Sequence, residues 1–437
     1  MTRARMSLTT AALALAIVPT TAWGQVREEG TKENETRASA TELGLDVAIE
    51  RAEQQNETWQ ITEQRITQAR ARVEQARTAF YPTVQAGASV TRNPSAVELN
   101  GRVILPVYSW EASAGAGITL FDGTRMPEVA RANASMESER ARAEWQRATI
   151  QFEVASAWYT LAATQAQIEL LEEILVLREQ DVERAEALVR GERAVPLDVS
   201  RARADLLATQ QQRLDAIAAR QDAADALAVL LGQEADGALL ASGGVEALET
   251  PATLPAQDVS LEERADFQAT ARAIDAAAQA EEAQSRRWWP TVDLGANALI
   301  GPPALTRPNG YFWSITLSAN WVIYDGGLRR LQLDELSSRT EELRLQQSLV
   351  LRQERAELVR IRRQIELARA SEEVIDARVK NSEEALRLAK LRFAAGTASS
   401  IEIRDATSAL LDARSAHILN RLNIKLALAR YDYLSRL

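Results

Sequence analysis

The sequence predicts a mainly α-helical protein that carries four membrane-type β-strands and is built from two copies of one unit. Two stretches without an interior proline, about 127–190 and 327–395, are long enough for helices on the order of 95 Å. Four shorter runs alternate apolar and polar residues, as a strand with two different faces does. Three sequence landmarks recur in the same order, about 205 residues apart. Together these patterns indicate a duplicated unit of strands and long helical hairpins.

The composition excludes several kinds of chemistry. The 437 residues include no cysteine and one histidine, which removes disulfides, thiolate zinc sites and thiol nucleophiles and leaves no histidine-rich metal site. The net charge of −10 argues against nucleic-acid binding, which needs a basic surface. No phosphate-binding loop or Ser-His-Asp set is present. We therefore expect no enzyme, no cofactor and no metal site.

The N-terminus has the organisation of a secretory signal peptide, residues 1–24. Two arginines precede a short apolar run at 8–18, and small residues follow it. Residues 25–40 are polar and aperiodic, so we expect a flexible N-terminal tail. Without a cysteine the exported chain is not lipidated. No later stretch reaches the roughly 18 apolar residues of a transmembrane helix, so contact with a membrane requires a β-barrel.

The three landmarks define the repeat. Residues 80–88 recur as 288–296, at an offset of 208. The Asp-Gly pair at 122–123 recurs at 325–326, and Gly191 recurs as Gly396, at offsets of 203 and 205. These matches predict a first repeat at 41–231, an equatorial connector at 232–259 and a second repeat at 260–437.

Each repeat is expected to run from a helix through two strands into a long helical hairpin. The aromatic-Pro-Thr junction ends the first helix, because proline disfavours helical geometry in the residue before it. In the last strand Trp313, Ile315 and Leu317 alternate with polar residues. Each run has about 9–11 residues, enough to cross a bilayer when tilted. The strands are expected at 83–92, 111–121, 291–300 and 312–323.

The aromatic residues fall into two groups, one at each end of the strands. Rings at both edges of an apolar band are typical of the interfacial girdles of membrane barrels. The alternative is a soluble β-sandwich whose rings cap a core, but four short strands offer little to pack against. One group consists of Tyr108, Trp110, Tyr311, Phe312 and Trp313. The other consists of Phe80, Tyr81, Phe121, Trp288, Trp289 and Tyr324.

Four strands do not close a barrel, and an open edge in lipid is not viable. Several chains must therefore share one barrel, which predicts a homo-oligomer. Three copies would give twelve strands, although this arithmetic alone leaves two or four copies open.

The long helices carry apolar residues at intervals of seven, for example Leu161, Ile168 and Leu175. A strict seven-residue repeat imposes left-handed supercoiling, so we expect a coiled-coil α-barrel. The hairpins turn at 190–196 and 395–400, where Gly191 and Gly396 are expected to supply the left-handed geometry that closes a helix. His417 falls on such a stripe, where a single polar residue is usually a register device.

These features together resemble the TolC family of outer-membrane efflux and secretion channels. The resemblance rests on the signal peptide, the duplicated strand-pair and hairpin, and the C-terminal segment from Gly396 through Glu402 and Asp405 to Lys425. It implies a homotrimer with a twelve-stranded barrel in the outer membrane of a Gram-negative bacterium and a helical tunnel in the periplasm. It also implies docking to a periplasmic adaptor protein and an inner-membrane RND, MFS or ABC transporter.

The resemblance also implies two sets of functional residues. The hairpin tips would contact the adaptor, and ordinary hairpin closure is the alternative role. The tip residues are Arg190, Gly191 and Glu192 in the first repeat and Ala395, Gly396 and Thr397 in the second. Glu402 and Asp405, with Asp198 at the place of Glu402 in the first repeat, match a selectivity ring at the periplasmic gate. They also suit a helix N-terminus. Ala398 replaces a gating arginine of the family.

Two other classes remain as alternatives, a periplasmic coiled-coil adaptor and a structural envelope protein. An adaptor needs soluble β-domains around one hairpin, and a fibre needs no alternating strands. Efflux and secretion channels share one scaffold, so the sequence does not select among drugs, metals and secreted proteins as cargo.

Overall fold

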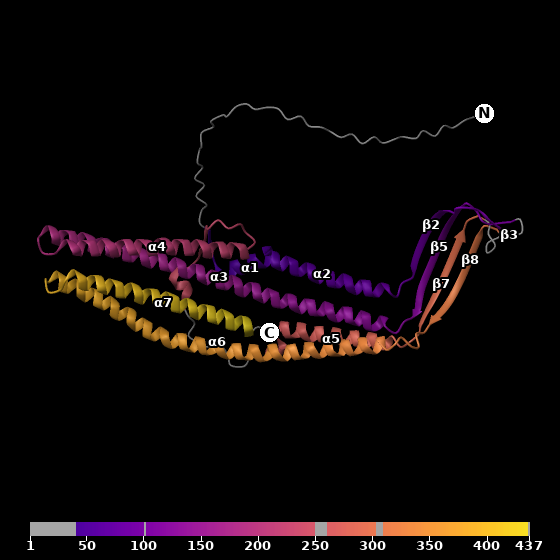
Figure 1. The fold of residues 1–437 in the computed structure, drawn as a ribbon. Helices are drawn as coiled ribbons and strands as arrows, with labels where there is room; N and C mark the ends of the chain where they lie inside the picture. Colours follow the sequence, from indigo (N-terminus) through magenta and orange to yellow (C-terminus); the bar gives the residue numbers. More distant parts are fainter. Residues whose placement is uncertain (1–40, 100–101, 250–259, 303–308, 436–437) are drawn as a thin grey trace, which may run out of the picture. The chain divides into compact units, whose positions relative to one another are not determined.

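The computed structural model describes residues 41–99, 102–249, 260–302 and 309–435, in which helices and one four-stranded sheet predominate (Figure 1). The predicted signal peptide and N-terminal tail lie outside the described residues, as does part of the connector. The helices within the described ranges are α1 (Leu45–Gln55), α2 (Glu57–Thr78), α3 (Arg125–Arg190), α4 (Pro196–Leu230), α5 (Ala265–Arg286), α6 (Leu328–Ala394) and α7 (Ser400–Ser435). Two short 3-10 helices, Gly244–Leu248 and Leu261–Glu263, lie between the two hairpins in sequence.

Four strands form an antiparallel sheet in the order β2-β5-β7-β8. They are β2 (Thr83–Arg92), β5 (Tyr108–Phe121), β7 (Thr291–Ile300) and β8 (Tyr311–Asn320). The short strands β3 (Val97–Leu99) and β4 (Arg102–Leu105) form a hairpin in the segment between β2 and β5. The strands β1 (Thr41–Leu43) and β6 (Leu239–Ala241) pair in parallel beside the helices.

Three strand boundaries differ from those predicted. β5 begins at Tyr108 rather than at 111, because Tyr108 to Trp110 continue the alternation and pair with β2. β8 begins at Tyr311 rather than at 312 and ends at Asn320 rather than at 323. Asn320 pairs with Thr291, and the residue before Thr291 is Pro290, which has no N–H to extend the ladder.

The register gives the sheet two chemically different faces. Residues paired directly across antiparallel strands point to the same side. One such row, in order across the sheet, is Val84, Ala116, Ala296 and Ile315. The next row is Gln85, Gly115, Asn297 and Ser314. Val84 and Ile315 are 80% and 67% exposed, so none of the residues that the structure describes covers the apolar face at these two positions.

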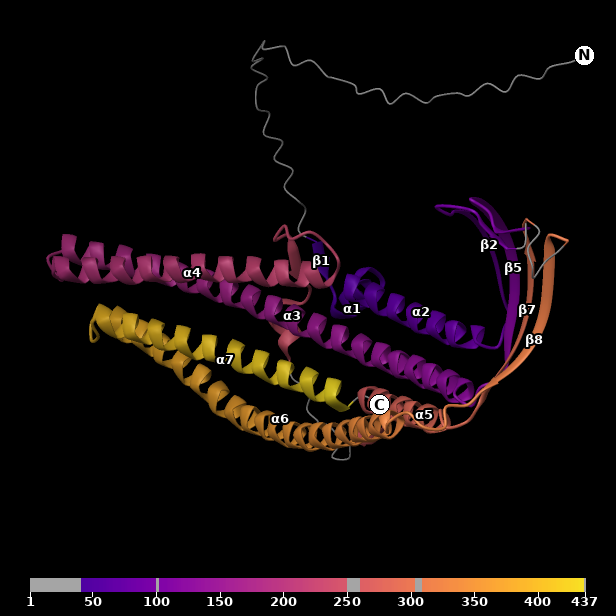
Figure 2. The same ribbon diagram turned by 45° about the vertical axis from the view of Figure 1, so that its right-hand side comes forward.

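The long helices connect the sheet to the hairpin turns. β2 follows α2, and β5 leads into α3, so the sheet lies at one end of these helices and the turns lie at the other (Figures 1 and 2). The 66 residues of α3 and 67 residues of α6 correspond to helices of about 100 Å. In the first repeat the helix before the strands is broken at Asn56, whose side chain accepts hydrogen bonds from the Thr58 and Trp59 amides and caps α2.

The main core surrounds α3. Leu161 and Ile174 of α3 pack with Leu227 of α4, and all three are almost fully buried. In contrast, α6 carries an exposed apolar row, which is formed by Leu345, Leu349, Val359, Leu367 and Val374. Within the described parts of the chain, no helix combines the length and apolar composition needed to span a membrane.

Candidate functional site

The aromatic residues at the end of the sheet far from the helices lie mostly on its apolar face. Tyr108 and Trp110 pair with Arg92 and Val90 of β2. Tyr311 and Trp313 pair with Ile300 and Ala298 of β7. These positions share the face of Val84 and Ile315. Phe312 pairs with Leu299 on the polar face, because neighbouring residues of a strand point to opposite sides. The structure therefore separates Phe312 from the other rings of this group.

At the helix end of the sheet, the rings pack on one another and on arginines. Phe121 and Trp289 stack with their centroids 6.1 Å apart. The Arg125 guanidinium lies 5.6 Å from the Phe80 ring, and Arg329 lies 4.1 Å from the Trp288 ring. Tyr81 and Tyr324 are exposed.

One further ring joins this group. The Trp321 indole donates a hydrogen bond to the Trp288 carbonyl, at 2.9 Å. The sequence assigned Trp321 to the interior of a strand. Pro290 ends the pairing between β7 and β8 at Asn320, and this signal in the sequence would have placed Trp321 beyond the strand, at the helix end of the sheet.

The first hairpin tip corrects the predicted role of a glycine. The left-handed residue is Glu192, with φ 56°, whereas Gly191 has φ −85°. In the second tip Gly396 has φ 74°, as a helix-ending glycine was expected to have. The Arg193 amide bonds to the Leu188 carbonyl as the Thr397 amide bonds to the Arg392 carbonyl, which aligns the tips at an offset of 204 rather than 205. A left-handed non-glycine residue costs about 1–2 kcal/mol, and this cost falls on an exposed acidic residue.

The candidate selectivity carboxylates do not have the same surroundings. Glu402 accepts a hydrogen bond from Arg392 of α6, with Nη1 and Oε2 2.9 Å apart. Asp405 is exposed and has no ion-pair partner among the described residues. Asp198 lies in the first turn of α4, half-buried, and likewise has no charged partner within the described ranges. The arginine therefore reduces the negative charge that Glu402 presents, whereas Asp405 keeps its own.

A polar network joins the two hairpins near their tips. Arg404 of α7 forms an ion pair with Asp205 of α4, with its Nη2 atom 2.6 Å from Oδ2. Arg178 of α3 is 4% exposed and donates to the Ser408 hydroxyl at 2.7 Å. Its Nη1 atom lies 3.8 Å from the same Asp205 oxygen. Sequence reasoning missed these residues, because they lie about 200 positions apart and follow no periodicity.

His417 contacts a carboxylate at the seam between α6 and α7. Its Nε2 atom lies 3.3 Å from Asp376 Oδ1. Burial and the nearby Arg421 lower the pKa of His417, against the opposite effect of Asp376 and Glu372, and this favours the neutral imidazole. Within the described ranges, no group of three or more His, Cys, Asp or Glu residues lies together as a metal site would require.

These features define a class of protein, an envelope channel that combines a two-faced strand sheet with long helical hairpins. The sequence matches the outer membrane efflux protein family over residues 48–233 and 257–432. The chain belongs to this family, whose members are conduits of the Gram-negative outer membrane rather than enzymes. A search of curated proteins returned no significant match.

Solved structures of outer-membrane channels share this fold. The VceC outer membrane protein from Vibrio cholerae is 23% identical with a TM-score of 0.75, covering 90% of this chain and 96% of its own. The CmeC outer membrane channel from Campylobacter jejuni is 14% identical with a TM-score of 0.76, covering 95% and 93%. The MtrE outer membrane channel from Neisseria gonorrhoeae, in its open state, is 19% identical with a TM-score of 0.72, covering 89% and 88%.

Proposed function

We propose that this chain forms a homotrimeric exit duct in the outer membrane, as part of a tripartite efflux pump or a type I secretion system. A signal peptide would export it without lipidation. The duct would be passive, because an inner-membrane RND, MFS or ABC transporter would supply the energy through a periplasmic adaptor. The hairpin tips would dock to that adaptor. The observation that carries this proposal is the apolar face of the sheet, on which Val84 and Ile315 are 80% and 67% exposed.

The free edges of the chain support assembly into a ring. The edge strands of the sheet are β2, from the first repeat, and β8, from the second. Pairing β8 of one copy with β2 of the next is a head-to-tail contact. Such contacts form a closed ring when a whole number of copies completes one full rotation. Three copies give twelve strands, within the range of known membrane barrels. The exposed apolar row of α6 would be covered in the same contact.

The basic test of this function is membrane extraction followed by conductance measurement. Expressed with its own N-terminus, the chain is expected in the outer-membrane fraction and to need detergent for extraction. It should migrate as a heat-modifiable oligomer and form channels in planar bilayers. A chain recovered entirely in the soluble fraction would exclude this function and favour an adaptor or a structural coiled-coil protein.

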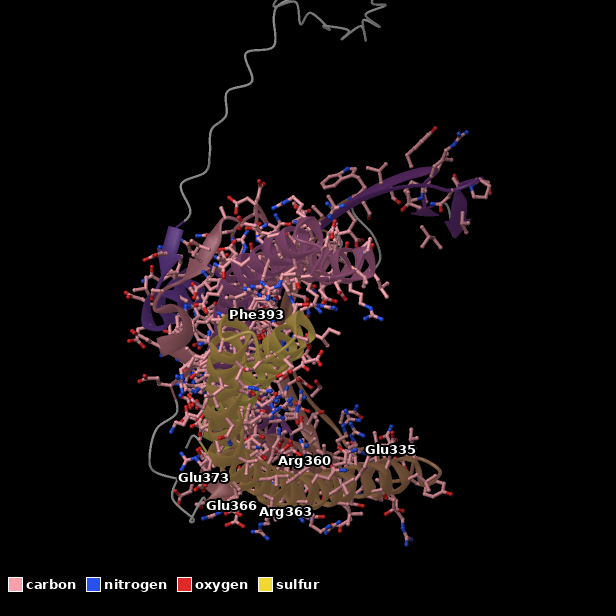
Figure 3. The ribbon with its side chains drawn as sticks, turned by 90° about the vertical axis from the view of Figure 1, so that its left-hand side faces the viewer. Glu335, Arg360, Arg363, Glu366, Glu373 and Phe393 are labelled. Carbon is pink, nitrogen blue, oxygen red and sulfur yellow. The ribbon has the colours of Figure 1, made fainter. Side chains whose placement is uncertain are left out.

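Ion selectivity tests the role of the tunnel carboxylates. Converging like charges in a narrow pore attract counter-ions. Asp405→Asn is expected to reduce the preference for cations, and to do so more than Glu402→Gln, because Arg392 already neutralises Glu402. The measurement is the reversal potential of purified channels in a salt gradient. Glu373→Gln, an exposed carboxylate of α6 labelled in Figure 3, is the control and should change nothing. Identical reversal potentials in Asp405→Asn and the parent channel would contradict the assignment of Asp405 to ion selectivity.

Channel opening tests whether the network between the hairpins holds the gate. Arg404→Ala removes a partly buried ion pair that joins α4 to α7. Hydrogen bonds to charged groups contribute about 1.5–3 kcal/mol, so the population of separated hairpins should rise at least tenfold. Single-channel recordings should show a higher open probability. Arg203→Ala breaks an ion pair within the first hairpin only and should leave the gate unchanged. Equal open probabilities in the two variants would show that this network does not hold the gate closed.

A further inference from the structure

Four arginines gather where the second repeat passes between its strands and its helices. Arg286 is the last residue of α5 and Arg287 follows it, while Arg329 and Arg330 lie in the first turn of α6. We name these four residues the arginine collar. Two tryptophans, Trp288 and Trp289, follow the first pair directly. The collar therefore borders the exposed rings at the helix end of the sheet.

The collar is held together by contacts between its two segments. Arg329 is 7% exposed, and its Nη1 atom donates to the Arg287 carbonyl at 3.1 Å. The same arginine pairs with Asp325, with Nε and Oδ2 2.7 Å apart, and covers the Trp288 ring. Arg286 pairs with Glu282 and lies 5.6 Å from the Trp289 ring. These bonds fix the backbone that presents the other two arginines.

Arg287 and Arg330 have exposed side chains. Neither has an ion-pair partner among the residues that the structure describes. An exposed stretch lies close in sequence to Arg330, formed by Trp321, Val322 and Ile323, which are 60%, 50% and 73% exposed. The collar thus combines uncompensated positive charge with an uncovered apolar surface.

The first repeat has no such collar. The strands β2 and β7 begin at an offset of 208, which places Thr78 and Ala79 opposite Arg286 and Arg287. The amide of Arg125 bonds to the Asp122 carbonyl as that of Leu328 bonds to Asp325, an offset of 203. Met126 and Pro127 therefore stand opposite Arg329 and Arg330. All four arginines are replaced by uncharged residues.

The two junctions accordingly differ in charge. Segments 282–289 and 324–331 together contain four arginines and two acidic residues, for a net charge of +2. The matching segments 74–81 and 121–128 together contain two arginines and three acidic residues, for a net charge of −1. Duplication alone does not require this difference, because the turn before the strands is the same in both repeats: the Tyr81 amide bonds to the Thr78 carbonyl as the Trp289 amide bonds to the Arg286 carbonyl.

We propose that the arginine collar binds the phosphate of an anionic phospholipid, with Arg287 and Arg330 as its ligands. This inference rests on the proposed function, which puts the helix end of the sheet at the inner leaflet of the outer membrane. Arginine suits phosphate because its guanidinium offers several donors in a plane. The tryptophans suit the headgroup level, where amphipathic rings settle. The apolar stretch at 321–323 receives an acyl chain, which distinguishes a lipid from free phosphate.

Lipid titration of the detergent-extracted oligomer tests the proposal. The probes are short-chain phosphatidylglycerol, phosphatidylcholine with the same chains, and inorganic phosphate, and native mass spectrometry counts the bound molecules. Each basic residue near an anionic headgroup strengthens binding by about fivefold. Two uncompensated arginines therefore predict an approximately 25-fold preference for phosphatidylglycerol over phosphatidylcholine, with one strong site per chain.

The variant R287Q/R330Q should lose most of this preference. R352Q/R363Q is the matched control, because it removes the same charge from exposed arginines in the middle of α6 that have no ion-pair partner among the described residues (Figure 3 labels Arg363). Equal binding of both lipids, or an unchanged preference in R287Q/R330Q, would overturn the proposal. Inorganic phosphate that binds as tightly as the lipid would also overturn it.

A loss of the oligomer in R287Q/R330Q would reassign the two arginines to a contact between subunits. The same preparation is tested for conductance. Channels that conduct but show no lipid preference disprove the collar alone, whereas absent channels disprove the proposed function.

Discussion

Ile315→Arg is expected to prevent the chain from reaching a stable membrane-inserted form, whereas Thr316→Arg, one residue along, is expected to be tolerated. Ile315 lies at the middle of β8, in the exposed apolar row with Ala296. An arginine on the lipid face at the bilayer midplane costs about 2–4 kcal/mol per strand. In a ring of identical copies, each copy carries this cost. We expect a large decrease in the fraction that becomes a heat-modifiable oligomer.

Thr316 is a stringent control because it shares the strand, the depth and the introduced charge. It pairs with Gly295, which pairs with Gly117 on the polar face. The two glycines leave space beside residue 316, and the polar face of a membrane barrel is in contact with water. The measurement is the yield of detergent-extracted oligomer for both variants at equal expression. Equal yields, whether high or low, would contradict the assignment of the two faces.

Arg264→Ala is expected to lower the stability of the helical region by about 3–5 kcal/mol, the usual effect of removing one partner of a buried ion pair. Arg264 is 1% exposed and pairs with Asp266 through two hydrogen bonds, at 2.7 and 2.8 Å. It also donates to Glu354 of α6 and to the Leu434 carbonyl near the end of α7.

Aromatic rings complete the site of this arginine. The Arg264 guanidinium lies 4.4 Å from the Trp145 ring and 5.1 Å from the Phe267 ring. Burial would lower the pKa of Arg264, but hydrogen bonds and charge from Asp266 and Glu354 raise the pKa above its usual value. The side chain therefore stays charged at neutral pH. Its removal would leave two acidic groups without their partner where α3, α5, α6 and α7 meet.

Arg355→Ala is the matched control for this prediction. Arg355 pairs with Glu262 at 2.8 Å, but both side chains are more than half exposed. Exposed pairs typically contribute about 0.2–1 kcal/mol. Thermal unfolding of the detergent-extracted protein should show a much lower midpoint for Arg264→Ala than for Arg355→Ala. Similar midpoints would show that the buried cluster does not hold these helices together.

The sequence predicts best what repeats with a period. Alternation predicts that Ile315 and Thr316 occupy opposite faces, and the register agrees. The same alternation places Phe312 on the polar face. The predicted aromatic groups were based only on position along the strand, so they did not take this into account. The repeat predicts both hairpin turns but misplaces the left-handed residue of the first by one position. That assignment assumed a glycine, and Glu192 adopts the conformation instead.

Contacts between distant segments carry no such signal. Arg404 and Asp205 lie at unrelated places in the two repeats, and their ion pair depends on how α4 and α7 pack together. Arg392 reaches Glu402 across a hairpin, so a carboxylate that looks free in the sequence has a partner in the fold. The same holds for Arg264, whose partners come from three segments. The packing of the long helices, rather than a local sequence pattern, determines which residues form these ion pairs.

The number of chains in the membrane-extracted particle tests the central claim most directly. Native mass spectrometry of the detergent-solubilised protein, followed by bilayer recording on the same sample, measures both assembly and conduction. We expect a trimer that needs detergent for extraction and conducts ions. A monomer that stays soluble without detergent and forms no channel would contradict it.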